Sequence, residues 1–222
     1  MKSFKNQQSG FTLVEIAIVL VIIGLLLGGI LKGQELINSA KAKSYASDFR
    51  VIQTSLYGFQ DRFKAIPGDY AAATTNISGA TTATSSGTLG NGQIDGPWNI
   101  TANSTDESCL VWQHLRLAGF LAGSTTPDCT TAGSTYTQKN ADGGRVGISS
   151  TMQMTLPTAM TGSYNICSTG VLGKIAKQLD TQLDDGNTST GSFRVSDPAT
   201  PGTALTNANV LDGNAYLICL AF

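Results

Sequence analysis

The chain has 222 residues, of which 41% are hydrophobic and only 13% are charged, and its 14 Lys+Arg and 15 Asp+Glu leave a net charge of -1. A globular domain usually has a charged fraction of roughly 25%. Because so few charges in such balance offer no broad basic surface to neutralise phosphates, we do not expect nucleic acid as a partner. The length suits one domain of ordinary size with an appendage.

The first element along the chain is an apolar run over residues 11–31, which contains a single charged residue, Glu15. A helix of this length extends about 32 Å, enough to cross the hydrocarbon of a bilayer. Lys2 and Lys5 precede the run without a neighbouring acid. The positive-inside rule therefore predicts a single-pass protein with a cytoplasmic N-terminus and an exported C-terminal part.

The apolar run differs from an ordinary secretory signal, whose apolar core has roughly 7 to 15 residues and ends at a small-residue cleavage site. This run is longer and is followed by Lys32, whereas the small residue Gly10 lies before it. Removal of residues 1–10 would leave Phe11 as the new N-terminus and would keep the anchor.

A short basic leader and an unbroken apolar stretch flank one hexapeptide, Gly10-Phe11-Thr12-Leu13-Val14-Glu15. In this arrangement the N-terminus resembles type IV prepilins and type II secretion pseudopilins. The resemblance implies that a prepilin peptidase cuts between Gly10 and Phe11 and methylates the Phe11 amine. It also implies an inner-membrane assembly platform and identical or related pilin subunits as partners, with polymerisation through the N-terminal helices.

One position departs from the resemblance. Many family members have a proline where this chain has Lys32. A proline-induced kink is therefore in doubt, although Gly28, Gly29 and Gly33 can soften the same part of the helix.

Glu15 places a carboxylate inside the apolar run. A charge at the bilayer centre costs up to about 2.5 to 3.5 kcal/mol, so such residues usually have partners. After cleavage the Phe11 amine of the same chain is badly placed to pair with Glu15, but the amine of a neighbouring subunit could meet it in a core of low dielectric. With the resemblance, we expect this assembly role; the alternative is a protonated or snorkelling Glu15.

The helix is expected to continue over residues 32–64. No proline interrupts residues 36–64, and apolar residues recur there at helical spacing: Tyr45, Phe49, Ile52, Leu56, Phe59 and Phe63. Such a stripe predicts a helix packed on its own globular head rather than a coiled-coil seam, since it spans fewer than three heptads. Ile66-Pro67-Gly68-Asp69 ends it.

The head is expected over residues 65–222. Residues 69–104 read as a long exposed loop, and Ser104 and Glu107 fit a capping box that opens a short helix closed by Gly119. We expect extended segments near residues 152–156 and 164–166, a helix over 168–185, and strands at 193–195 and 215–222, the last of them buried and central. This order predicts an α+β head with a small antiparallel sheet against the long helix, which matches the pilin fold that the resemblance implies.

The cysteines of the chain all lie in the predicted exported part. They are even in number and none forms a CxxC pair: Cys109, Cys129, Cys167 and Cys219. This favours two structural disulfides over a zinc or redox site. Of the three connectivities, we favour 109 with 129 and 167 with 219, because each pair lies within or between neighbouring predicted elements.

Motifs of catalysis are not found in the sequence. Its single histidine, His114, has no companion triad, HExxH or phosphate-binding loop. Asp180, Asp184 and Asp185 could form a carboxylate cluster, but acids at a helix end are more often solvated. We therefore predict no catalytic residue, no metal and no cofactor.

The sequence thus predicts a structural subunit of a type IV pilus-like filament, with a role in adhesion, motility or DNA uptake. A type II secretion pseudopilin is the alternative, and a membrane-tethered periplasmic enzyme or binding domain is a rival of another class. The expected location is the inner membrane with a periplasmic head, and then the cell surface or a periplasmic pseudopilus. The disulfides and Thr-rich loops lean toward a surface pilus.

Overall fold

The structure is a computed structural model that describes residues 12–85, 87–131 and 134–222. These residues fall into two compact units, one that ends at Ala40 and one that comprises Lys41–Phe222. Helix α1 spans Leu13–Phe63 and contributes to both units. It runs through Lys32 without a break, so the absence of a proline there coincides with a continuous helix.

In the first unit the large apolar side chains of α1 are exposed, from 46% for Ile23 to 91% for Leu13. In the second unit α1 becomes amphipathic, because its predicted stripe faces the core of the head. Five residues of the stripe are buried and the sixth, Phe63, packs partly buried against the same core: Tyr45, Phe49, Ile52, Leu56 and Phe59. Lys64, with a positive φ of 52°, follows the last helical residue.

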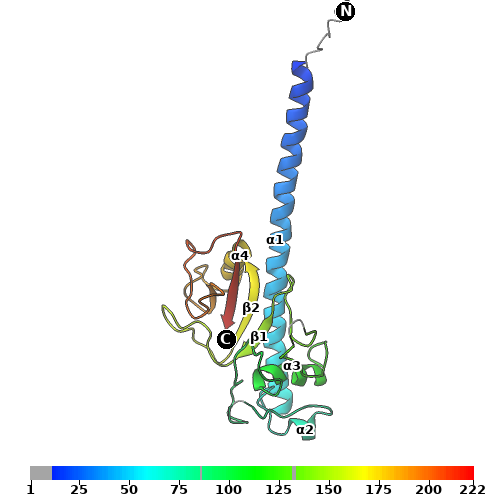
Figure 1. The fold of residues 1–222 in the computed structure, drawn as a ribbon, viewed down its shortest axis with the longest axis vertical. Helices are drawn as coiled ribbons and strands as arrows, with labels where there is room; N and C mark the ends of the chain where they lie inside the picture. The colour runs from blue at the N-terminus through cyan, green and yellow to red at the C-terminus, as the bar shows by residue number, and fades with distance from the viewer. Residues whose placement is uncertain (1–11, 86, 132–133) are drawn as a thin grey trace, which may run out of the picture. The chain divides into compact units, whose positions relative to one another are not determined.

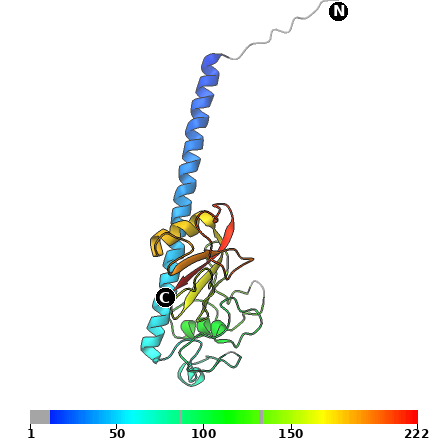
Figure 2. The ribbon, with the colours of Figure 1, turned by 90° about the vertical axis from the view of Figure 1, so that its left-hand side faces the viewer.

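The head contains a four-stranded antiparallel sheet of β1 (Val146–Ser149), β2 (Asn165–Leu172), β3 (Phe193–Ser196) and β4 (Ala215–Ala221). Its strand order is β1-β2-β4-β3, which places β4 inside the sheet as predicted. The sheet lies beside the later turns of α1 (Figure 1), and Phe222, just after β4, packs edge-on against Tyr57 of α1 at 5.9 Å between ring centroids. Figure 2 gives the same packing from a second side.

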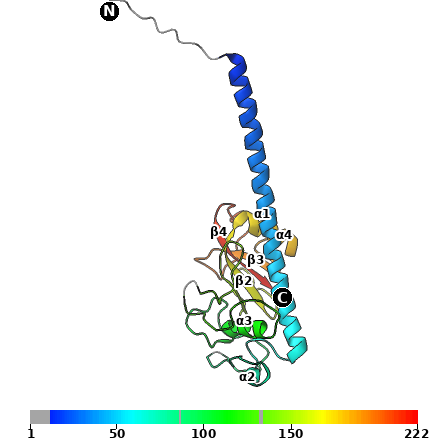
Figure 3. The same cartoon turned by 90° about the vertical axis from the view of Figure 1, so that its right-hand side faces the viewer.

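The described part of the head also contains the shorter helices α2 (Ala73–Asn76), α3 (Glu107–Leu117) and α4 (Gly173–Leu183). Figure 3 places α2 and α3 near the C-terminal turns of α1 and α4 beside the sheet. The ring of His114 in α3 stacks on Phe59 of α1, with 6.2 Å between centroids. The layout is the expected α+β, pilin-like one, a long N-terminal apolar helix with a small antiparallel sheet.

Two predicted helix starts are wrong. Residues 168–172 belong to β2 rather than to a helix, because they pair with β4 through a bulge at Gly170, whose φ is 75°. Helix α3 begins after Asp106 and has no side-chain cap. Ser104, the predicted cap, instead accepts a hydrogen bond from the Cys129 amide.

One loop prediction also needs correction. The expected extended segment over 152–156 is no strand of the sheet, although Met154 lies buried in the core as expected, and the strand just before it is β1. The connector over 69–104 is not simply exposed, because apolar residues spaced along it are buried in the head: Ile77, Ile94, Trp98 and Ile100. These anchors hold a mostly irregular segment against the core.

Candidate functional site

The N-terminal end of α1 is closed by a reciprocal pair of side chains. The Thr12 hydroxyl oxygen accepts a hydrogen bond from the Glu15 amide at 3.3 Å. In return, Glu15 Oε2 accepts from the Thr12 amide at 2.9 Å and from the Thr12 hydroxyl at 2.7 Å. This is a capping box, which satisfies backbone donors that the first helical turn leaves without partners.

The other carboxylate oxygen of Glu15, Oε1, has no hydrogen-bond partner within the described residues. Glu15 itself is exposed. Capping therefore occupies one oxygen and leaves the second able to accept a bond from another molecule.

The turns that follow Glu15 have the properties of a membrane span. Among the described helices, α1 alone is long and apolar enough to cross a bilayer, by length and composition. Its most apolar 18-residue window has a mean hydropathy of 2.8, and none of that window is buried. A helix that is apolar on all sides needs lipid or other protein around it.

Glycines in this part of α1 have no packing role in the described chain. A Cβ built at Gly24, Gly28, Gly29 or Gly33 meets no described atom within 4 Å. The first two and the last two are each four residues apart, a spacing that lets neighbouring helices approach closely.

The cysteines of the head form two disulfides, Cys109–Cys129 and Cys167–Cys219. These are the pairs that the order of the predicted elements favours. Cys167 and Cys219 lie directly opposite each other on β2 and β4, whereas the other bond ties α3 to the loop that follows it.

The remaining chemical groups singled out in the sequence lie in the head. His114 is fully buried, its Nδ1 accepts from the Gly68 amide at 2.9 Å, and its Nε2 lies 2.8 Å from the Thr81 carbonyl oxygen. Both ring nitrogens are thus engaged with backbone, which is a structural role.

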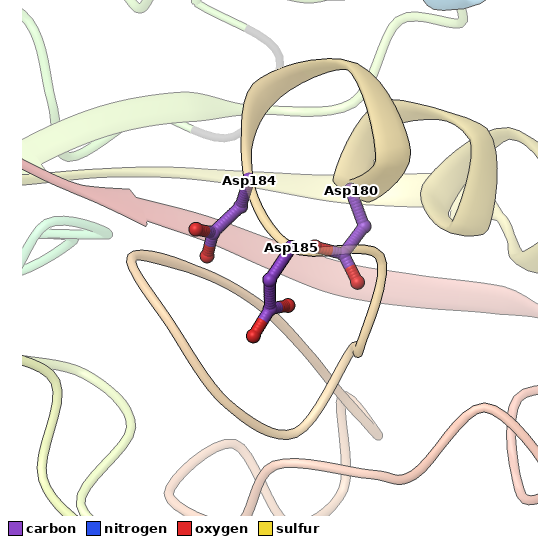
Figure 4. Close-up of side chains that lie close together, drawn as sticks. All are labelled: Asp180, Asp184 and Asp185. Carbon is purple, nitrogen blue, oxygen red and sulfur yellow. The ribbon is translucent and has the colours of Figure 1, made fainter.

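The aspartates at the end of α4 come together in the fold. One carboxylate oxygen from each of Asp180, Asp184 and Asp185 lies within 4.8 Å of the others (Figure 4). Burial of Asp180, followed by the charges of Asp185 and Asp184, raises the pKa of its carboxyl group to about 7.

The first 31 residues also carry a recognisable motif. The family model described as prokaryotic N-terminal methylation motif matches residues 5–31. The chain carries the prepilin-type cleavage and methylation motif. Neither the curated proteins nor the solved structures contain a significant match to the chain.

The prepilin-type motif is the mark of type IV pilin or pseudopilin precursors, a structural class rather than an enzyme class. It implies processing by a prepilin peptidase and assembly into a filament. Together with the apolar turns of α1, it fits a membrane-anchored single-pass protein.

Gly10 and Phe11, the predicted cleavage residues, lie outside the described residues. Within the described part, the capping role of Thr12 and Glu15 was missed from the sequence. Its signal was present, because Thr12-Leu13-Val14-Glu15 matches the capping-box pattern before an apolar run.

Proposed function

We propose that this chain is a structural subunit of a type IV pilus-like filament. The observation that carries the proposal is the exposed apolar surface around α1, which lies within and just beyond the prepilin-type motif. A bilayer covers such a surface before assembly, and the helices of neighbouring subunits cover it afterwards. The four glycines without packing partners support close helix contacts in that second environment.

In this proposal a prepilin peptidase cuts between Gly10 and Phe11 and methylates the Phe11 amine. The N-terminus faces the cytoplasm and the head lies in the periplasm, as Lys2 and Lys5 suggest. An inner-membrane assembly platform then inserts the subunit next to identical or related subunits.

Glu15 receives the incoming subunit. Its Oε2 caps its own helix, and its Oε1 accepts a bond from the methylated Phe11 amine of the neighbouring chain. An ion pair in the apolar core of a filament is attractive because the local dielectric is low. The pair would also offset the cost of keeping Glu15 charged in the bilayer.

The filament proposal is tested in the native host. Mass spectrometry of the mature chain should find an N-methylated Phe11 at its N-terminus, and electron microscopy of sheared surface material should find filaments that contain it. Filaments confined to the periplasm would identify a secretion pseudopilus instead. A mature chain that retains Lys2 and forms no filament would overturn the proposal in favour of a tethered periplasmic domain.

The assembly role of Glu15 is separated from capping by two substitutions. Glu15→Gln keeps an acceptor for the Thr12 amide and so keeps the capping box, but it removes the charge. Glu15→Ala removes both. We expect both variants to be cleaved and neither to form filaments.

The matched control is Glu35→Gln, at an exposed acid of the same helix that pairs with Lys32 three residues before it. Filaments should form normally in this variant. If Glu15→Gln also formed normal filaments while Glu15→Ala did not, capping rather than charge pairing would be the requirement for assembly.

A further inference from the structure

The end of α4 gathers three carboxylates in one small volume. Asp180 lies in the last turns of the helix, and Asp184 and Asp185 follow its last residue (Figure 4). Asp180 is fully buried, Asp184 is half-buried and Asp185 is exposed. The cluster therefore reaches from the interior of the head to its surface.

Asp180 is the unusual member. Its side chain is 0% exposed, and neither carboxylate oxygen has a partner in good hydrogen-bond geometry among the described residues. The Gly186 backbone amide lies close enough to lower the pKa of the Asp180 carboxyl group, but this is the smallest of the effects on it. Buried polar groups are almost always hydrogen-bonded, because a buried group without a partner loses the hydration that stabilises it in water. A buried carboxylate with so little hydrogen bonding, next to two further carboxylates, is suited to binding a cation.

The two other carboxylates are held in place by the backbone that follows. Asp184 Oδ2 accepts from the Phe193 amide at 2.8 Å. Asp185 accepts from the Asn187 amide at 2.8 Å and from the Thr190 hydroxyl at 2.9 Å. Each carboxylate oxygen has a further lone pair, so these bonds orient the two groups and still leave them able to bind an ion.

The surrounding charges also favour a cation. The C-terminal end of α4 carries the negative end of the helix dipole, which adds to the charge of the three aspartates. No lysine or arginine within the described residues forms a salt bridge with any of them. Arg194 acts on Asp185 only at longer range, and its guanidinium group is bonded to carbonyl oxygens such as that of Thr158.

We propose that Asp180, Asp184 and Asp185 form a site for one divalent cation, and that Ca²⁺ fits it best. Carboxylate oxygens are ligands for hard cations. Ca²⁺ binds such oxygens in a flexible geometry, whereas Mg²⁺ demands a near-ideal octahedron and keeps several of its waters. The three oxygens lie within 4.8 Å of one another, close enough for one Ca²⁺ to contact all of them.

The ion would join the end of α4 to the start of β3. Asp180 belongs to α4, while Asp184 is bonded to Phe193, the first residue of β3. Gly191 lies in the loop between Asp184 and Phe193. A Cβ built there would come 1.9 Å from Asp184 Oδ2, so the loop backbone passes close to this carboxylate. A bound cation would therefore fix the loop over 184–193 and the edge strand that follows it.

The experiment uses the full chain in detergent, stripped of metal with a chelator. Isothermal titration with CaCl₂, up to the concentration of about 1 mM at which weak extracellular sites fill, should give one bound Ca²⁺ per chain. Thermal unfolding should shift to a higher temperature, and MgCl₂ should give a smaller shift. Absence of both binding and shift in the wild-type chain would overturn the proposal.

Three variants locate the site. Asp180→Asn and Asp185→Asn should each weaken Ca²⁺ binding by roughly tenfold or more. Asp185→Asn guards against misfolding, because its side chain is exposed and the amide can still accept the Asn187 bond. Asp61→Asn removes an equally charged but exposed residue of α1 and should leave binding unchanged. Equal affinities in all three variants would overturn the site, since binding would then be a general property of the acidic surface.

Discussion

His114 shows how a single side chain depends on its surroundings. Burial lowers its pKa below the ordinary value of 6.5, and the bond to the Thr81 carbonyl opposes this only in part. Nδ1 of the neutral ring accepts a hydrogen bond from the Gly68 amide, which a doubly protonated ring could not do. The folded head therefore holds this histidine in its neutral form.

The stability of the head should depend on pH, because the pKa of His114 is lower in the folded chain than in the unfolded chain. Because the unfolded chain binds a proton near pH 6.5 and the folded chain does so only at lower pH, the contribution of His114 is complete above pH 6.5. It is lost as pH falls toward the folded pKa. As the chain has one histidine, the titration of its ring resonance by NMR reports it directly. A midpoint at or above 6.5 would contradict the prediction.

The sequence predicted only some of the properties of the candidate site residues. Asp180, Asp184 and Asp185 are close along the chain, so their proximity on one helix end is expected. The burial of Asp180 is not, because it depends on how α4 packs in the head. In the sequence, Glu15 stood out because it is a charged residue in an apolar run. Its hydrogen bonds with Thr12, which cap the start of the helix, were not predicted.

At the scale of elements, β1 is held at the sheet edge by a close backbone contact. A Cβ built on Gly147 would lie 1.9 Å from the carbonyl oxygen of Trp98. Trp98 is buried, and its indole nitrogen donates to Gln153 at 2.8 Å. The connector over 69–104 therefore crosses β1 where only a glycine leaves room.

Gly147→Ala should destabilise the head by about 1 to 3 kcal/mol, the usual cost of forcing extra volume into a packed site. Urea or thermal unfolding of the full chain in detergent measures the change. Gly213→Ala is the matched control, because no described atom lies within 4 Å of its Cβ position, and its effect should stay within about 0.5 kcal/mol. If the two variants were equally stable, the connector would be able to move away from the added methyl group without a loss in the free energy of unfolding.

Elements with a strong local signal were predicted, and those decided by distant partners were not. The stripe from Tyr45 to Phe63 repeats at helical spacing, and β4 is apolar on both faces, so each was predictable. In β2, by contrast, Ser168, Thr169 and Gly170 give no alternation, and only the pairing of β2 with β1 and β4 makes them part of a strand. The helical period of α4 was therefore extended too far toward the N-terminus.

At the scale of the whole molecule, the two compact units differ in what they need. The second unit, Lys41–Phe222, has its own core and both disulfides. The first consists of α1 with its apolar side chains exposed. We therefore expect the second unit to fold and stay in solution by itself, and the first unit to be the part that requires detergent or lipid.

A fragment of residues 41–222, produced under oxidising conditions, should fold without detergent. Size-exclusion chromatography should find a monodisperse species, and its circular dichroism should melt cooperatively. The full chain should require detergent under the same conditions. A fragment that aggregates or melts without a transition would mean that the earlier turns of α1 contribute to the stability of the head.

The position of β4 sets the order in which the head can be made. It is the last strand along the chain, yet it lies between β2 and β3 and pairs with both. As the chain is synthesised, β2 can pair with β1, but β3 must wait for residues 215–221. Cys167 can form its native bond only after Cys219 has been made. Cys109 and Cys129 can be oxidised earlier. A chain released before β4 is made has no central strand, so only a chain that includes it can present a finished head for assembly.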